Sequence, residues 1–184
     1  MQKTENNLHK TDKTMNFFSG QTFTMGGNSP QDRFHQHRIP LYYGIQYNHA
    51  GPVLLRIDDG PIFRADGPHV FFTHPGAFFD YSPPPGMKRH HMFICTEGER
   101  IRKYIESGLM DLSADSPLVP VPDPARLYLS MRQLLELIRQ DNAAPRAVLL
   151  FEEILLQIYE ARTKQQTQSA LTETSGSRIC ATIC

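Results

Sequence analysis

Turn-forming residues recur at short intervals between Pro40 and Thr96, and this spacing limits the possible folds more than any other feature of the chain. Intervals of about seven to ten residues separate the segments Gly51-Pro52, Asp59-Gly60-Pro61, Asp66-Gly67-Pro68, Pro75-Gly76 and Pro83-Pro84-Pro85-Gly86. Hydrophobic residues alternate with polar ones between these turns, which is typical of strands. Parallel strands need longer crossover connections than these intervals allow. We therefore expect an antiparallel β-barrel or sandwich over residues 38–96.

The hydrophobic period changes from two to about 3.6 residues after Cys95, which indicates helices. A short helix is predicted over Glu99–Leu109. Asp123 and Pro124 form a capping signal before a second helix over Ala125–Gln140. A third helix is predicted over Arg146–Arg162, so the last two helices form a hairpin.

Composition and charge restrict the functional class. The chain has 184 residues, of which 40% are hydrophobic, and this is enough for one core. Nineteen basic and nineteen acidic side chains give a formal net charge of zero, so we expect no surface for nucleic acid. The three cysteines are too few for a disulfide framework, and no apolar run has the length of a membrane span or a secretory signal. A cytoplasmic location is expected.

Composition also suggests three regions. Residues 1–32 are polar with a few phenylalanines and are expected to form a flexible N-terminal arm. Residues 33–162 are expected to form the main domain. Residues 163–184 begin with a polar, weakly patterned stretch and are expected to be a linker followed by the truncated start of another domain.

Polar and aromatic side chains in the predicted strands suggest a small polar ligand inside the barrel. Tyr43, Tyr81 and His90 offer hydrogen-bonding groups and aromatic faces, although each is also explained by packing in the wall. Strand alternation puts His90 and Met92 on one side and Arg89 on the other. We expect Tyr81 and His90 to face the interior.

The order of several segments resembles the N-terminal effector-binding and dimerisation domain of AraC-family transcription regulators. The resemblance runs from about Arg38 to Ala161. It rests on Tyr47-Asn48-His49-Ala50-Gly51, Thr73-His74-Pro75-Gly76, the strand Arg89–Cys95 and the helix Phe151–Ala161. No single segment is highly specific, but the ordered set, which covers most of the chain, is fairly specific.

The resemblance implies a cupin-like barrel, or double-stranded β-helix, that binds a small effector such as a sugar beneath an N-terminal arm. The family's arabinose-responsive member uses side chains that match Arg38, Tyr81, His90 and Met92 by position. Met92 stands where the family often has an aromatic residue, so a stacking contact is lost. The family implies that DNA is bound only through a C-terminal domain, which this chain lacks, and that the helical hairpin forms a homodimer.

The third predicted helix carries more apolar residues than one domain can cover. Leu149, Leu150, Leu156 and Tyr159 lie outside its main apolar stripe and are the expected dimer interface. The alternative is that the preceding helix covers them within one subunit.

Catalytic and metal sites are not expected. The pair His35 and His37 could bind a metal ion, but metal-binding cupins carry a glutamate a few residues after this motif, and here none follows. Cys95 lies in an apolar strand end, and the chain has no serine elbow or phosphate-binding loop. We therefore predict a binding module without a cofactor. The alternatives are a cupin enzyme, either metal-dependent or a sugar isomerase, and an orphan sugar-binding protein.

Overall fold

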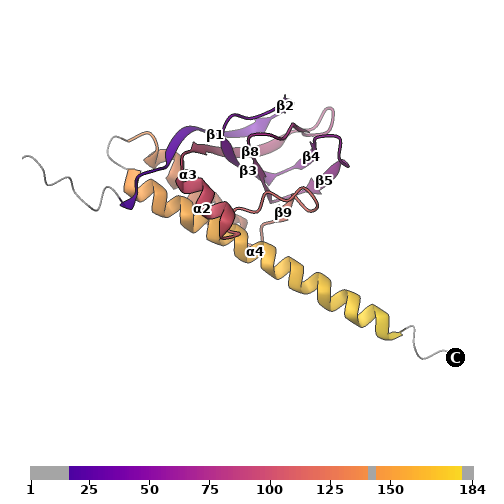
Figure 1. Ribbon diagram of the computed structural model, residues 1–184. Helices are drawn as coiled ribbons and strands as arrows, with labels where there is room; N and C mark the ends of the chain where they lie inside the picture. Colours follow the sequence, from indigo (N-terminus) through magenta and orange to yellow (C-terminus); the bar gives the residue numbers. More distant parts are fainter. Residues whose placement is uncertain (1–16, 141–143, 180–184) are drawn as a thin grey trace, which may run out of the picture.

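Within the described residues, the fold consists of two antiparallel sheets and three helices, arranged as in Figure 1. The computed structural model describes residues 17–140 and 144–179. The strands are β1 (Thr22–Asp32), β2 (Gln36–Arg38), β3 (Tyr43–Ala50), β4 (Pro52–Ile57), β5 (Phe63–Asp66), β6 (His69–Thr73), β7 (Phe79–Ser82), β8 (Arg89–Glu97) and β9 (Val119–Pro120). The helices are α2 (Arg100–Glu106), α3 (Pro124–Leu137) and α4 (Ala144–Ile179).

The strands are ordered β1-β8-β3-β6-β9 in the five-stranded sheet and β2-β7-β4-β5 in the four-stranded sheet. Side chains from the two sheets meet in one apolar cluster, which includes Phe71 of β6, Leu55 of β4 and Tyr81 of β7. We call the region between the two sheets the interior. The opposite face of the five-stranded sheet, with Tyr47 and Met92, packs against the helices.

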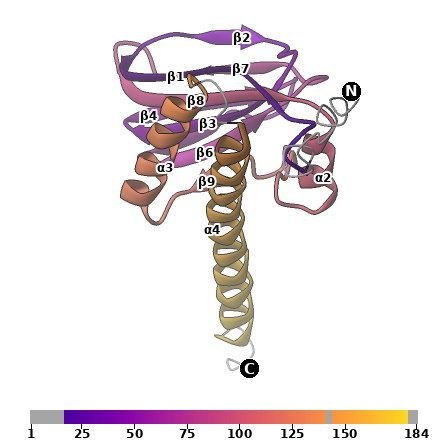
Figure 2. The same ribbon diagram turned by 90° about the vertical axis from the view of Figure 1, so that its left-hand side faces the viewer.

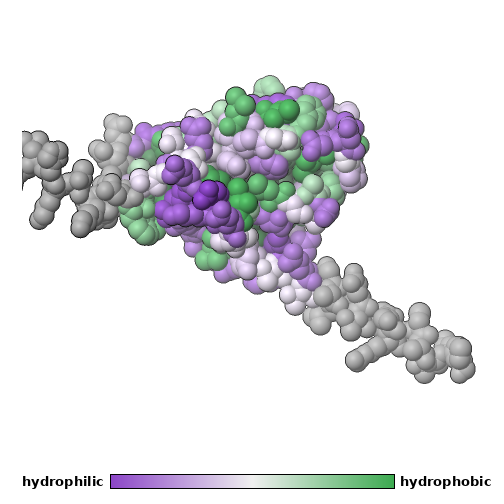
Figure 3. Space-filling model, viewed as in Figure 1, coloured by the Kyte–Doolittle hydropathy of each residue, from purple (hydrophilic) through white to green (hydrophobic). Residues whose placement is uncertain are grey.

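The helices cover only this outer face, and Figure 2 shows α3 and α4 on the side of the sheets away from β2. Asp123 caps α3 by accepting a 3.0 Å hydrogen bond from the backbone N–H of Arg126, and Pro124 begins the helix. On α2, Ile101 is buried and Arg102 is exposed, so the surface over this helix is hydrophilic (Figure 3). The predicted antiparallel strands followed by helices are confirmed.

The predicted N-terminal arm is wrong for residues 22–32, because these residues form β1. This strand pairs with β8 from Thr22 opposite Glu97 to Asp32 opposite Arg89. Its one phenylalanine, Phe23, packs edge-to-face on Phe151 with ring centroids 5.6 Å apart, which ties the strand to α4. Residues 1–16 of the expected arm lie outside the described residues.

The predicted linker after residue 162 is also wrong in part, because α4 continues to Ile179. The sequence has no glycine or proline between Pro145 and Gly176, so nothing in it ends the helix earlier. Residues 180–184 lie outside the described residues. Among the helices described, none is both long and apolar enough to cross a membrane.

Candidate ligand-binding site between the sheets

Six polar side chains converge in the interior from five different strands. None of them is more than 7% exposed, although each carries hydrogen-bonding groups. They are Asp32 of β1, Gln46 of β3, Thr73 of β6, Tyr81 of β7, and Arg89 and His91 of β8. We call these residues the interior cluster. Buried polar groups are costly unless they are paired, so each bond in this cluster matters.

Arg89 is the centre of the interior cluster, and part of its guanidinium lacks a partner. Its Nε donates a 2.8 Å hydrogen bond to Oδ2 of Asp32, and both side chains are almost completely buried. The guanidinium carbon lies 5.3 Å from the centroid of the Tyr81 ring, which is within the range of a cation–π contact. The two terminal nitrogens are buried and make no hydrogen bond to any residue that the structure describes. Unpaired buried donors destabilise a protein, so these nitrogens are suited to an acceptor brought by a ligand.

Gln46 links the other members of the interior cluster. Its Nε2 donates to the Thr73 hydroxyl at 3.1 Å, and its Oε1 accepts from the Tyr81 hydroxyl at 3.4 Å. The same oxygen lies 3.0 Å from Nε2 of His91, and this contact assigns the imidazole proton to Nε2. The Thr73 hydroxyl therefore accepts from Gln46 and keeps its own hydrogen for another acceptor.

The interior cluster carries no excess charge near neutral pH. Burial, followed by the charge of Arg89, holds the pKa of His91 well below its usual value, so the imidazole is neutral. Burial raises the pKa of Tyr81 to about 12, so its hydroxyl is protonated. The positive charge of Arg89 is balanced by its partner Asp32.

Arg38 of β2 is the cross-strand neighbour of Phe79, whose side chain is buried between the two sheets. The Arg38 side chain is exposed, and its guanidinium donates to the Tyr42 hydroxyl. Burial raises the pKa of Cys95 to about 11, and the Arg38 charge acts in the opposite direction. The positive charge of Arg38 also acts to lower the pKa of Tyr81, against the larger effect of burial, so Arg38 lies close enough to influence the interior. The Cys95 thiol is protonated at neutral pH, as expected for an inert buried cysteine.

Phe93 provides an aromatic surface on the interior side of β8. Its ring stacks on His91 at a centroid distance of 5.5 Å and an interplanar angle of 27°, and it is only partly buried. Gly27 lies opposite it on β1. A Cβ atom at Gly27 would lie 2.6 Å from the Phe93 ring, so the absence of a side chain at this position makes room for the ring.

The structure separates the predicted ligand residues into two groups. Tyr81 lies in the interior, as expected, whereas Arg38 is exposed on the neighbouring strand β2. Tyr43, His90 and Met92 do not lie in the interior: Tyr43 and Met92 pack against the helix-side core. Phe93, one position after Met92, presents an aromatic ring on the interior side of β8.

His90 was predicted to face the interior, and this prediction is wrong. Its Nε2 lies 2.7 Å from Oδ1 of Asn28, and its ring contacts His49 and Tyr128 on the helix side. His91 occupies the interior position instead. His90 and His91 do face opposite sides of β8, as predicted, but the side that faces the interior is that of His91. The apolar pair Met92 and Ile94 indicated the helix-side face, since the interior of this sheet is the more polar of its two faces.

The predicted interface residues lie on α4. Leu149, Leu156 and Tyr159 are 52%, 43% and 42% exposed, and we call these three residues the α4 strip. Leu150 is partly buried against the core. The α4 strip is therefore not covered by α3, contrary to the alternative raised from the sequence.

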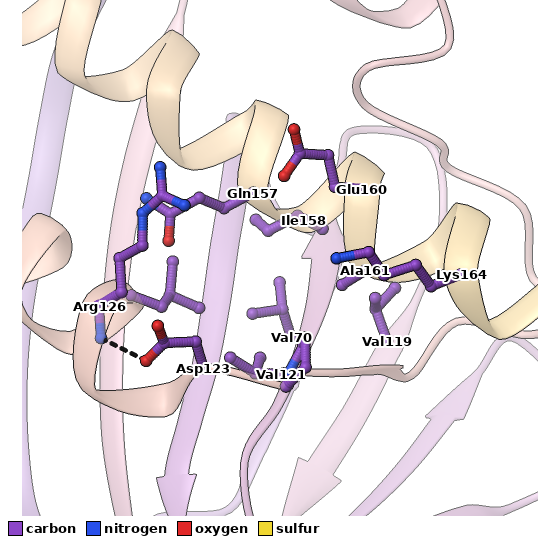
Figure 4. Close-up of a pocket in the computed structure, with 12 residues that line it drawn as sticks. Val70, Val119, Val121, Asp123, Arg126, Gln157, Ile158, Glu160, Ala161 and Lys164 are labelled. Atoms are coloured by element: carbon purple, nitrogen blue, oxygen red, sulfur yellow. Dashed lines mark hydrogen bonds between the residues drawn. The ribbon is translucent and has the colours of Figure 1, made fainter.

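A cavity of about 250 Å³ lies outside the interior, between α4 and the end of the five-stranded sheet. Figure 4 shows Val70, Val119 and Val121 on one side of it and α4 on the other. Gln157 and Lys164 of α4 also line it. This cavity shares no residue with the interior cluster.

A family model described as the AraC-like ligand binding domain matches residues 23–159. The chain belongs to this family. The match to the AraC-like ligand-binding domain includes every residue of the interior cluster. A search of curated proteins found no match. Among solved structures, the cupin domain of Schizosaccharomyces pombe Cnp3 is similar, with 10% identity and a TM-score of 0.34 over 49% of this chain. This chain covers 64% of that domain, which is less than two thirds of its length.

Proposed function

We propose that this chain is the ligand-sensing and dimerisation domain of an AraC-type bacterial transcription regulator, acting in the cytoplasm. We further propose that its effector is a small, neutral, hydroxylated molecule such as a sugar, bound in the interior. The observation that carries the proposal is the unpaired state of the two buried terminal nitrogens of Arg89. The family match supports the role of the domain as a ligand-binding unit.

The charges and hydrogen-bonding groups of the interior cluster favour a hydroxylated ligand over an ion. Arg89 and Asp32 neutralise each other, and His91 is uncharged, so the interior cluster has no unbalanced charge of its own for an ionic ligand to pair with. Hydroxyl groups both donate and accept, which suits the free donors of Arg89 and Thr73. The Phe93 ring offers a flat surface against which the apolar face of a sugar can pack.

Dimerisation is the second part of the proposal, and the α4 strip supports it. Leu149, Leu156 and Tyr159 are large apolar or aromatic side chains that stay 42–52% exposed in the single chain. Two antiparallel copies of α4 would bury the α4 strip of each protomer against that of the other. The regulator would bind DNA as this dimer through a further domain.

A screen by thermal unfolding tests the effector class. Neutral monosaccharides and polyols are compared with the corresponding sugar acids and amino sugars. We expect a rise in melting temperature with a member of the neutral set, and a smaller rise with its acid. The conservative change Thr73→Val removes one hydroxyl from the interior and should reduce the rise. Stabilisation by sugar acids alone would contradict the proposal.

The same ligand distinguishes a binding module from an enzyme. After prolonged incubation with the protein, the hit is recovered and analysed by NMR. A binding module returns the sugar unchanged, whereas a sugar isomerase converts it to its isomer. Conversion that depends on His91 would replace the proposed function with the enzyme alternative.

A further inference from the structure

A second group of chemically capable side chains lies on the outer face of the four-stranded sheet. Phe79 and Tyr81 of β7 point into the interior, so Asp80 between them points outward. His37 of β2 is the cross-strand neighbour of Asp80, and His35 lies two residues earlier on the same side. The pairing of β2 with β7 therefore brings a carboxylate to the two histidines.

The three side chains are within reach of a common point. Nε2 of His35 lies 2.5 Å from Oδ1 of Asp80, and Nδ1 of His37 lies 3.7 Å from Oδ2. One ligand atom from each residue falls within 4.8 Å of the others. For bonds of about 2.0–2.1 Å, a tetrahedral ion needs ligand atoms roughly 3.3 Å apart. Only small movements of the side chains are needed to reach this arrangement.

We propose that His35, His37 and Asp80 bind one divalent first-row transition-metal ion, for which Zn²⁺ is the reference ion. Two imidazoles and one carboxylate suit Zn²⁺ and its neighbours in the series, whereas Mg²⁺ and Ca²⁺ prefer oxygen ligands. No glutamate closely follows the histidine pair in the sequence, but Asp80 supplies a carboxylate from β7, the strand that pairs with β2. Water would fill the remaining coordination positions.

The surroundings of the three ligands allow this binding. The side chains of His35 and His37 are 59% and 61% exposed, so both rings can turn toward an ion at little cost. Asp80 is only 16% exposed and is held by Arg56, whose terminal nitrogen lies 2.7 Å from Oδ2. Oδ1 of Asp80 stays directed at His35, so Arg56 orients the carboxylate for the ion. The positive charge of Arg56 lowers the affinity, so we expect reversible binding rather than a permanent structural ion.

The position of the site links it to the interior without overlapping it. The ion would join the short strand β2 to β7, whose Tyr81 belongs to the interior cluster, and Arg38 directly follows His37 on β2. The metal site lies on the opposite face of β7 from Tyr81. This inference therefore goes beyond the proposed effector site and does not depend on it.

The test uses the untagged 184-residue chain, stripped of metal with a chelator and then dialysed. Co²⁺ is titrated in while visible absorption is recorded, and Zn²⁺ is titrated in by calorimetry. We expect one ion per chain and an increase in melting temperature with Zn²⁺. His37→Gln and Asp80→Asn should each lower the affinity at least about tenfold and remove the increase. Circular dichroism without metal checks that each variant is folded.

A matched control uses the other pair of neighbouring histidines. His49 and His90 lie on the outer face of the five-stranded sheet, with ring centroids 5.0 Å apart. The double variant H49A/H90A should bind Co²⁺ and Zn²⁺ as the wild type does. The proposal would be overturned if His37→Gln and Asp80→Asn both still bind the ion, or if H49A/H90A does not. It would also be overturned if the wild type binds far less than one ion per chain.

Discussion

The Nε atom of Arg89 donates a 2.8 Å hydrogen bond to Oδ2 of Asp32, and neither side chain is more than 4% exposed. The pair joins the start of β8 to the end of β1. Nδ1 of His91 lies 3.6 Å from the same carboxylate oxygen. A buried pair of this kind adds little net stability when intact, but loss of one partner leaves a buried charge alone.

Asp32→Asn tests this ion pair. The substitution keeps the shape of the side chain and removes the charge that balances Arg89. We expect a loss of about 3–5 kcal/mol in the free energy of unfolding, measured by urea titration.

Asp66→Asn is the matched control, because Asp66 forms an ion pair with Arg64 in which both side chains are more than half exposed. We expect a loss of less than about 1 kcal/mol. Equal losses in the two variants would show that the Arg89–Asp32 pair is not the buried contact described here.

The pH dependence of stability should report on His91. Its folded-state pKa is lowered by burial and by Arg89, so the unfolded chain takes up a proton near pH 6.5 while the folded protein does not. The contribution of His91 to stability is therefore intact above about pH 6.5 and is lost as the pH falls below that value.

His91→Gln keeps a donor for Gln46 and removes this titration. We expect the melting temperature of the wild type to fall between pH 7.5 and pH 5.5, and the fall to be smaller in the variant. His49, His69 and His90 also have pKa values lowered by burial, so part of the fall should remain. An unchanged pH profile in His91→Gln would refute a neutral, buried His91.

The oligomeric state depends on the α4 strip. Leu156→Glu places a charge in its centre and should give a monomer in sedimentation equilibrium, where we expect the wild type to be a dimer. Leu129 of α3 is 63% exposed and lies outside the strip, so Leu129→Glu should remain dimeric. A wild type that is monomeric at all concentrations would contradict the proposed interface.

The periodicity of the sequence was enough to predict the antiparallel strands and the helices, but it could not show which face of β8 meets the interior. Met92 packs under the helices and His91 lies between the sheets, and both are at most 7% exposed. A strand that is buried on both faces lacks the alternation of buried and exposed residues that would set its phase. The sequence therefore led to His90 as the interior residue of β8, whereas the structure has its neighbour His91 there.

Contacts between distant strands were beyond prediction for a different reason. The carboxylate beside His37 belongs to Asp80, and only the pairing of β2 with β7 brings the two together. The burial of Arg89 likewise depends on Asp32, which the sequence assigned to a flexible arm. The hydrophobic pattern of one segment contains no information about which charged residue another strand will supply.

The most direct test of the account compares two neighbouring residues on β8 by calorimetry with the neutral monosaccharide or polyol found by thermal screening. His91 lies in the interior cluster, whereas His90 lies on the helix side of the same strand. We predict that His91→Gln, which removes the ring that stacks on Phe93, weakens binding about tenfold or more and that His90→Gln leaves the affinity within about twofold of the wild type. Equal affinity in wild type and His91→Gln, or a greater loss in His90→Gln, would show that the effector does not bind between the sheets.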